Sequence, residues 1–139
     1  MHPDVAREAR RWLRYAREDL ASAVRLSDEA PPRHAAWLAQ QAAEKAVKAV
    51  LVALQIVFPY VHDLDRLVAL VPDGWGVRDV GGDLALLTSF AVESRYPDDL
   101  PDVRRAEART GVALAHRVVE AVETDLLPLV AERGGGGPA

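Results

Sequence analysis

Residues 34–58 read HAAWLAQQAAEKAVKAVLVALQIVF, and this stretch decides the fold of the chain. On a helical wheel its polar side chains occupy an arc of about 140°, and every other position is apolar. The polar residues are Gln40, Gln41, Glu44, Lys45, Lys48 and Gln55. A helix this apolar must be buried on more than one side. It is therefore either the central helix of a bundle or part of a subunit interface, and its many alanines allow neighbouring helices to approach closely.

Two further long helices are predicted on either side of this stretch. Residues 4–27 carry apolar side chains at helical spacing, with arginines on the opposite face. The last helix is expected over residues 102–127, where Pro128 marks its end. Shorter helices are predicted over 63–71 and 83–93, each bounded by residues typical of turns.

The fold class follows from these helices and from the absence of any alternating pattern. No stretch alternates apolar and polar residues with a period of two, so no strands are predicted. We expect an all-α protein, an antiparallel helical bundle of three long and two short helices. With 139 residues the chain is long enough for one domain, expected over residues 1–130. Residues 131–139 are rich in glycine and are expected to form a flexible tail.

Composition excludes several functional classes. Lys and Arg total 17 against 21 Asp and Glu, a net charge of −4, which argues against a protein that coats nucleic acid or anionic membranes but leaves room for a local basic site. The absence of cysteine excludes disulfide scaffolds, thiolate zinc sites and Cys nucleophiles. The four histidines are scattered, so we expect no metal site and no cofactor. Without a signal-peptide core or an apolar run of roughly 18 residues, a cytoplasmic protein with no membrane association is expected.

The loop over residues 94–102 is the first candidate functional site. It presents Arg95 and Tyr96 beside acidic residues, an arrangement that suits a phosphate or a nucleotide, since loops on a rigid scaffold often carry function. The alternative is a polar connection in which Pro97 and Pro101 fix the bend and Tyr96 fills the core.

Arg109 and His116 on the last helix form the second candidate site. Seven positions apart on a helix, they project in nearly the same direction, about 10 Å apart along the axis. A histidine beside a cation can act as a general base next to a group that stabilises phosphate. The alternative is a solvated helix face on which His116 pairs with Glu120.

Three aromatic residues, Trp12, Tyr15 and Trp37, lie at positions typical of a helix core. Because aromatic residues at this spacing usually pack in the core, we expect them to lie inside the protein. The sequence therefore predicts no platform on which bases would stack.

Four stretches in this order and spacing resemble a known family. They are residues 12–20 (WLRYAREDL), residues 35–49 (AAWLAQQAAEKAVKA), His62-Asp63-Leu64 and residues 94–98 (SRYPD). Together they resemble the HEPN domain, named for nucleotide binding in higher eukaryotes and prokaryotes. The likeness covers roughly residues 9 to 126, and its most specific part is the segment over residues 36–49.

The resemblance implies a small, single-domain prokaryotic protein that forms homodimers. It also implies a gene paired with that of a minimal nucleotidyltransferase, in a toxin–antitoxin arrangement. On this interpretation the chain is a helical module that binds a nucleotide or RNA. The residues expected to bind the nucleotide or phosphate are Arg95, Tyr96 and His62.

The alternative that the resemblance implies is a metal-independent ribonuclease. Many HEPN ribonucleases use an Arg followed a short distance later by a His, and only Arg109 and His116 have this spacing in the later part of the chain. In that chemistry the histidine assists proton transfer at the 2′-hydroxyl and the arginine stabilises phosphate charge. A third interpretation is a helical protein with neither activity, in which the resemblance gives the fold alone.

Overall fold

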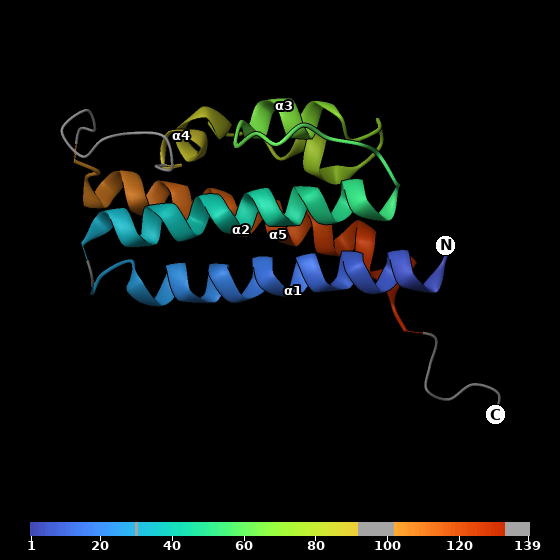
Figure 1. Cartoon of the computed structure of the whole chain (residues 1–139). Coiled ribbons are helices and arrows are strands. Elements are labelled where there is room, and N and C mark those ends of the chain that lie inside the picture. Colours follow the sequence, from blue (N-terminus) through green and yellow to red (C-terminus); the bar gives the residue numbers. More distant parts are fainter. Residues whose placement is uncertain (30, 92–101, 133–139) are drawn as a thin grey trace.

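The computed structural model describes residues 1–29, 31–91 and 102–132, and within these ranges all regular structure is helical (Figure 1). The elements are α1 (Pro3–Leu26), α2 (Pro32–Ala53), α3 (Leu64–Ala69), the 3₁₀-helix η1 (Gly76–Asp79), α4 (Leu84–Ser89) and α5 (Arg105–Val130). The prediction of an all-α fold with three long and two short helices is confirmed. None of these helices is long and apolar enough to cross a membrane.

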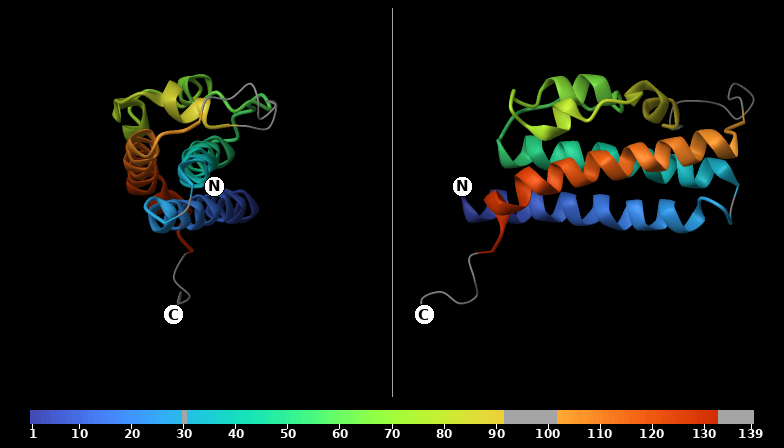
Figure 2. Two further views of the ribbon diagram at one scale, coloured as in Figure 1. Left: turned by 90° about the vertical axis from the view of Figure 1, so that its left-hand side faces the viewer. Right: turned by 180° about the vertical axis from the view of Figure 1, so that it is seen from behind.

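Helix α2 is the central helix of the bundle. It lies between α1, α5 and a layer formed by α3 and α4, as both views of Figure 2 show. Of its 22 residues, 14 are buried, including seven alanines that are fully inaccessible to solvent. Small side chains at these positions let α1 and α5 approach α2 closely. A single chain thus covers α2, and the apolar character of this helix does not by itself require a second subunit.

The helix directions follow from how the middle of the chain returns. Helix α1 runs antiparallel to both α2 and α5, as predicted (Figure 1). Helices α2 and α5, however, run in the same direction. The reason is that residues 54–91 travel back over the bundle as the layer that contains α3 and α4. The expected antiparallel arrangement therefore does not extend to this pair.

The layer above α2 is tied together by capping contacts. The carboxylate of Asp63 accepts a hydrogen bond from the amide of Arg66 (3.2 Å) and caps α3. The amide of Leu64 donates to Oγ1 of Thr88 (3.0 Å), which joins α3 to α4. Helices α3 and α4 are both shorter than expected, because α3 ends at Ala69 and α4 ends at Ser89.

Helix α2 ends at Ala53, before the predicted end at Phe58. Gln55 adopts a positive φ of 55°, and the amide of Ile56 donates to the carbonyl of Leu51 (2.9 Å). This is a Schellman motif, which closes a helix and is usually marked by glycine at the position of positive φ. Because a glutamine holds that position here, the sequence carries no signal of the helix end.

Helix α5 continues through Pro128 to Val130, beyond the predicted end at residue 127. Val130 is fully buried, and its carbonyl accepts a hydrogen bond from the guanidinium of Arg10 on α1. Burial and this contact hold the last turn in place. A proline near the end of a helix removes only one backbone hydrogen bond, which these interactions offset.

Gly111 on α5 is where α4 meets the long helices. A Cβ atom at this position would lie 2.6 Å from Cε2 of Phe90, a ring that is only 4 % exposed. The missing side chain therefore makes room for the ring, although glycine inside a helix is less favourable than alanine by about 1 kcal/mol.

We predict that Gly111→Ala destabilises the protein despite its better helix propensity. Forcing a methyl group against a buried ring typically costs about 1–3 kcal/mol. The gain in helix propensity from Gly to Ala is about 1 kcal/mol, so the clash outweighs it over most of that range. Thermal unfolding should show a lower Tm for Gly111→Ala and a Tm within about 2 °C of wild type for the exposed neighbour variant Thr110→Ala. An unchanged or raised Tm for Gly111→Ala would show that Phe90 moves aside freely.

Candidate functional site

A row of polar side chains is buried along α2. Gln40, Glu44 and Lys48 are spaced four residues apart, so they lie on one face of the helix, and none is more than 5 % exposed. Nε2 of Gln40 donates to Oε1 of Glu44 (2.7 Å), and Nζ of Lys48 donates to Oε2 (2.9 Å). Burying charges is unfavourable unless they are paired and hydrogen-bonded, and here Glu44 and Lys48 satisfy each other.

His62 joins this row from the segment that follows α2. Its Nδ1 lies 2.7 Å from Oε1 of Glu44. Because a carboxylate can only accept, Nδ1 carries the proton of this hydrogen bond. The contact sets the orientation of the imidazole, whose side chain remains 28 % exposed. His62, one of the residues expected to bind a nucleotide, is therefore held in a fixed orientation at the surface of the protein.

The hydrogen bonds keep Glu44 ionised. Burial by itself raises the pKa of this carboxyl, but hydrogen bonds from Lys48, His62 and Gln40 outweigh burial, so the pKa lies below its ordinary value. Glu44 is therefore an anion at neutral pH and compensates the buried ammonium of Lys48.

Three aromatic rings surround Lys48. Its Nζ lies 6.0 Å from the ring centroid of Trp12 and 5.6 Å from those of Phe58 and Tyr60, distances typical of cation–π contacts. The ring of Tyr60 also packs edge-to-face against His62, with centroids 6.2 Å apart. Tyr60 is 89 % exposed, so the cluster opens to solvent on this side.

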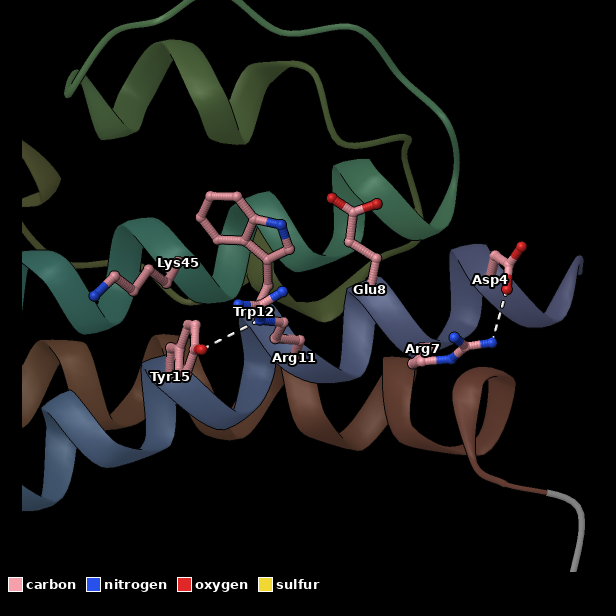
Figure 3. A pocket seen from close by; sticks show the side chains of 7 residues that line it. All are labelled: Asp4, Arg7, Glu8, Arg11, Trp12, Tyr15 and Lys45. Carbon is pink, nitrogen blue, oxygen red and sulfur yellow. Dashed lines mark hydrogen bonds and ion pairs between the residues drawn. The ribbon is translucent and has the colours of Figure 1, made fainter.

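A groove of about 570 Å³ lies beside Trp12 (Figure 3). It is lined by Asp4, Arg7, Glu8, Arg11, Trp12 and Tyr15 of α1 and Lys45 of α2. Arg7 forms an ion pair with Asp4 (2.7 Å), and Lys45 forms one with Asp19 (2.5 Å). These two cations are neutralised within the chain, whereas Arg11 contacts a tyrosine.

Tyr15 lies between two arginines. The guanidinium carbons of Arg11 and Arg14 are 5.6 Å and 5.2 Å from its ring centroid, and Nε of Arg11 donates to the tyrosine hydroxyl (3.2 Å). This hydrogen bond from Arg11 lowers the pKa of Tyr15 below its ordinary value. The expectation that Trp12, Tyr15 and Trp37 lie inside the protein is therefore met only in part, because Trp12 packs against the core but also borders the groove. Trp12 and Tyr15 are half-buried and border the groove, and Trp37 is 37 % exposed.

Arg109 and His116 are both exposed on α5, and each is held by a carboxylate. Nη2 of Arg109 lies 2.5 Å from Oδ1 of Asp28, at the end of α1. Nδ1 of His116 lies 3.6 Å from Oε2 of Glu120. The second contact is the one expected for a solvated helix face. No hydrogen bond or ion pair joins Arg109 to His116 among the residues that the structure describes.

The remaining expected site residues, Arg95 and Tyr96, lie outside the described residues. Within the described ranges no group of three or more His, Asp or Glu side chains is placed to hold a metal ion. The sequence did not identify Glu44, Lys48 or Trp12 as site residues. The signal for the first two was the polar arc on an otherwise apolar helix, which marks an internal polar row when the helix is central.

We predict that Glu44→Gln destabilises the protein by about 3–5 kcal/mol near neutral pH, because the substitution leaves Lys48 buried without a counter-charge. Since the pKa of Glu44 is lowered in the folded protein, the stability that the carboxylate contributes is present above about pH 4.3 and is lost as pH falls through the lowered value. The difference between wild type and variant should therefore shrink toward about pH 3.

Urea unfolding at both pH values measures this difference. The matched control is Glu18→Gln, an exposed carboxylate on α1, which should change stability by less than about 0.5 kcal/mol. A Glu44→Gln variant as stable as wild type near neutral pH, or a deficit that persists unchanged in acid, would contradict this role for Glu44.

Comparisons with known proteins agree with this architecture. Among solved structures, the chain is similar to TT1696 from Thermus thermophilus, with 28 % identity and a TM-score of 0.69 over 84 % of this chain and 96 % of that one. It also shares the fold of ST0689, an archaeal HEPN homologue, with 23 % identity and a TM-score of 0.65 over 85 % of this chain and 97 % of that one. A search of curated proteins found no match.

The family comparison covers the whole bundle. The model of the HEPN domain matches residues 9–125, a range that runs from the first half of α1 almost to the end of α5 and includes the buried polar row, His62 and most of the groove. The family expected from the sequence is thereby confirmed, and the chain belongs to the HEPN domain family.

Proposed function

We propose that this chain is a helical module that binds a nucleotide or RNA, acts as a homodimer and partners a minimal nucleotidyltransferase in a toxin–antitoxin-type pair. Family membership supports the partner and the dimer. The observation that carries the binding role is the buried carboxylate of Glu44, which holds the imidazole of His62 at the surface beside Tyr60.

The arrangement around His62 suits a nucleotide. The imidazole is fixed by the 2.7 Å contact with Glu44 and remains accessible, and Tyr60 presents a ring that is 89 % exposed. Unstacked bases pack on exposed aromatic rings, and an imidazole that is protonated on both nitrogens can donate to a phosphate while its Nδ1 stays bonded to Glu44. Arg95 and Tyr96 are proposed to supply the phosphate contacts, because an arginine binds phosphate through two parallel hydrogen bonds.

The homodimer that we propose uses surfaces other than α2, which the chain itself covers. Exposed apolar residues are available between α2 and α3, where Val57 is 92 % exposed, and near the end of α5, where Leu129 is 52 % exposed. A stable homodimer should bury more than about 1,000 Å² in total.

We predict that His62→Ala and Arg95→Ala each weaken nucleotide binding by about 1–3 kcal/mol, the usual cost of removing a hydrogen bond to a charged group. Titration calorimetry with ATP and AMP measures the effect. His34→Ala, which removes an exposed histidine near the start of α2, is the control and should bind as wild type does. Equal affinities for His62→Ala and His34→Ala would remove His62 from the site.

The pairing is tested in the same set of proteins. Light scattering at micromolar concentration should give the mass of a dimer, and growth arrest on expression of the chain should be relieved by co-expression of the minimal nucleotidyltransferase encoded beside it. A clean monomer, or growth that is unaffected by the chain, would count against this part of the proposal.

The second candidate function is a metal-independent ribonuclease that uses Arg109 and His116. The observation that favours it is that both side chains are exposed on the same side of α5, where an RNA can reach them. The carboxylates of Asp28 and Glu120 that hold them in the single chain would give way to phosphate. In a homodimer, the Arg109 and His116 side chains of the two chains could face each other, which would improve the site.

We predict for this candidate that the protein cleaves RNA in the presence of EDTA. Loss of a general base typically lowers the rate by at least about a hundredfold, so His116→Ala should do so, and Arg109→Ala should also lower it. His34→Ala again serves as the control. Cleavage that survives both substitutions would assign the activity to another site or to a contaminant, and no cleavage by wild type would leave the binding module as the function.

A further inference from the structure

Helix α1 carries a concentration of arginines that the proposed site around His62 does not use. Residues 7–17 contain five arginines and one acidic residue, Glu8, in a chain whose net charge is −4. Three of the five have carboxylate partners, in the pairs Arg7–Asp4, Arg10–Glu132 and Arg17–Glu123. Among the described residues, Arg11 and Arg14 have no ion pair and lie against Tyr15 instead.

The groove that Arg11 lines adjoins the cluster around Lys48 through Trp12. Trp12 and Tyr15 line it from α1, as Figure 3 shows. Trp12 also contacts Lys48, since its ring centroid lies 6.0 Å from Nζ, and the same Nζ lies 5.6 Å from the ring of Tyr60. Tyr15 and Trp12 thus border the groove, and Trp12 and Tyr60 contact the same buried ammonium.

We propose that single-stranded RNA binds along this groove, with bases against Tyr15 and Trp12 and phosphates at Arg11 and Arg14. Arg11 lines the groove, and Arg14 lies at its border, against the ring of Tyr15. The proposal rests on the proposed nucleotide- or RNA-binding function and extends that site from His62 to α1. Arg11 and Arg14 are three positions apart, about 4.5 Å along the helix, so their long side chains can reach neighbouring phosphates of one strand.

The aromatic rings favour RNA over an acidic protein segment. Unstacked bases pack on aromatic rings and on guanidinium planes, and both kinds of surface lie side by side at Tyr15. A carboxylate-rich peptide would need the guanidiniums alone. The groove also has too few free cations for a protein that coats RNA, which agrees with the net charge of −4.

The small number of free cations makes the expected salt dependence specific. For single strands the logarithm of affinity falls against the logarithm of salt concentration with a slope of about −0.7 for each phosphate neutralised. Two guanidiniums, Arg11 and Arg14, therefore contribute about −1.4 to the slope, and the proposed phosphate contact of Arg95 adds about −0.7. A basic groove with many phosphate contacts would give a much steeper dependence.

The test is fluorescence anisotropy with a labelled 12-nucleotide single-stranded RNA, titrated with the full chain at several salt concentrations. Wild type should bind at low salt with the shallow slope. The double variant Arg11→Ala/Arg14→Ala should weaken binding about tenfold or more and make the slope less steep by about 1.4. Tyr15→Leu should weaken binding without changing the slope. Arg25→Ala, an exposed arginine at the other end of α1, is the matched control and should bind as wild type does.

Three results would overturn the proposal. These are no binding by wild type at low salt, an equal loss in Arg25→Ala and in the double variant, and displacement of the RNA by poly-L-glutamate as efficiently as by unlabelled RNA. The last result would assign the surface to an acidic protein partner.

The proposed site around His62 is tested separately from the groove. It is contradicted when His62→Ala leaves nucleotide binding unchanged. Failure of the groove alone would leave RNA affinity intact in the double variant while His62→Ala still lowers it.

Discussion

The carboxylate of Glu44, buried in the middle of α2, is the interaction on which the arrangement around it depends. It accepts hydrogen bonds from Gln40, Lys48 and His62, and so satisfies the polar row of a helix that is otherwise apolar. The contact with His62 also ties the segment after α2 back onto the bundle, and that segment leads directly into α3. One buried anion therefore stabilises the central helix and places the first residues of the upper layer.

The polar row on α2 shows which features of the fold can be predicted from the sequence and which cannot. Apolar periodicity predicts each long helix because burial of one face is a local property of the sequence. It does not tell whether a polar arc faces solvent or the interior, because that depends on which other elements cover the helix. On α2 the arc containing Glu44 and Lys48 is buried. The helix end at Gln55 escaped prediction for a related reason, since its positive φ is imposed by backbone contacts and not by a glycine.

The candidate site was only partly predictable because its members come together in space. Trp12 belongs to α1 and Tyr60 to the segment after α2, yet both contact Nζ of Lys48. A scan for basic residues that alternate with aromatic ones misses such a cluster. It also missed the contact between Arg11 and Tyr15, because residues four positions apart are neighbours on a helix although they are separated in the sequence. His62, in contrast, was found through the short His-Asp-Leu stretch that carries the family resemblance.

Lys48 links the two halves of the proposed binding surface. Its ammonium is attracted by the faces of three rings and by Glu44, and it is accessible to solvent only to 5 %. Cation–π attraction strengthens when the cation is desolvated, so the ring positions are coupled to the charge of this buried pair. Loss of the anion would weaken the hold on His62, and loss of the cation would release Trp12 and Tyr60. The rings of Trp12, Phe58 and Tyr60 are thus held in place by a buried ion pair that no ligand needs to touch.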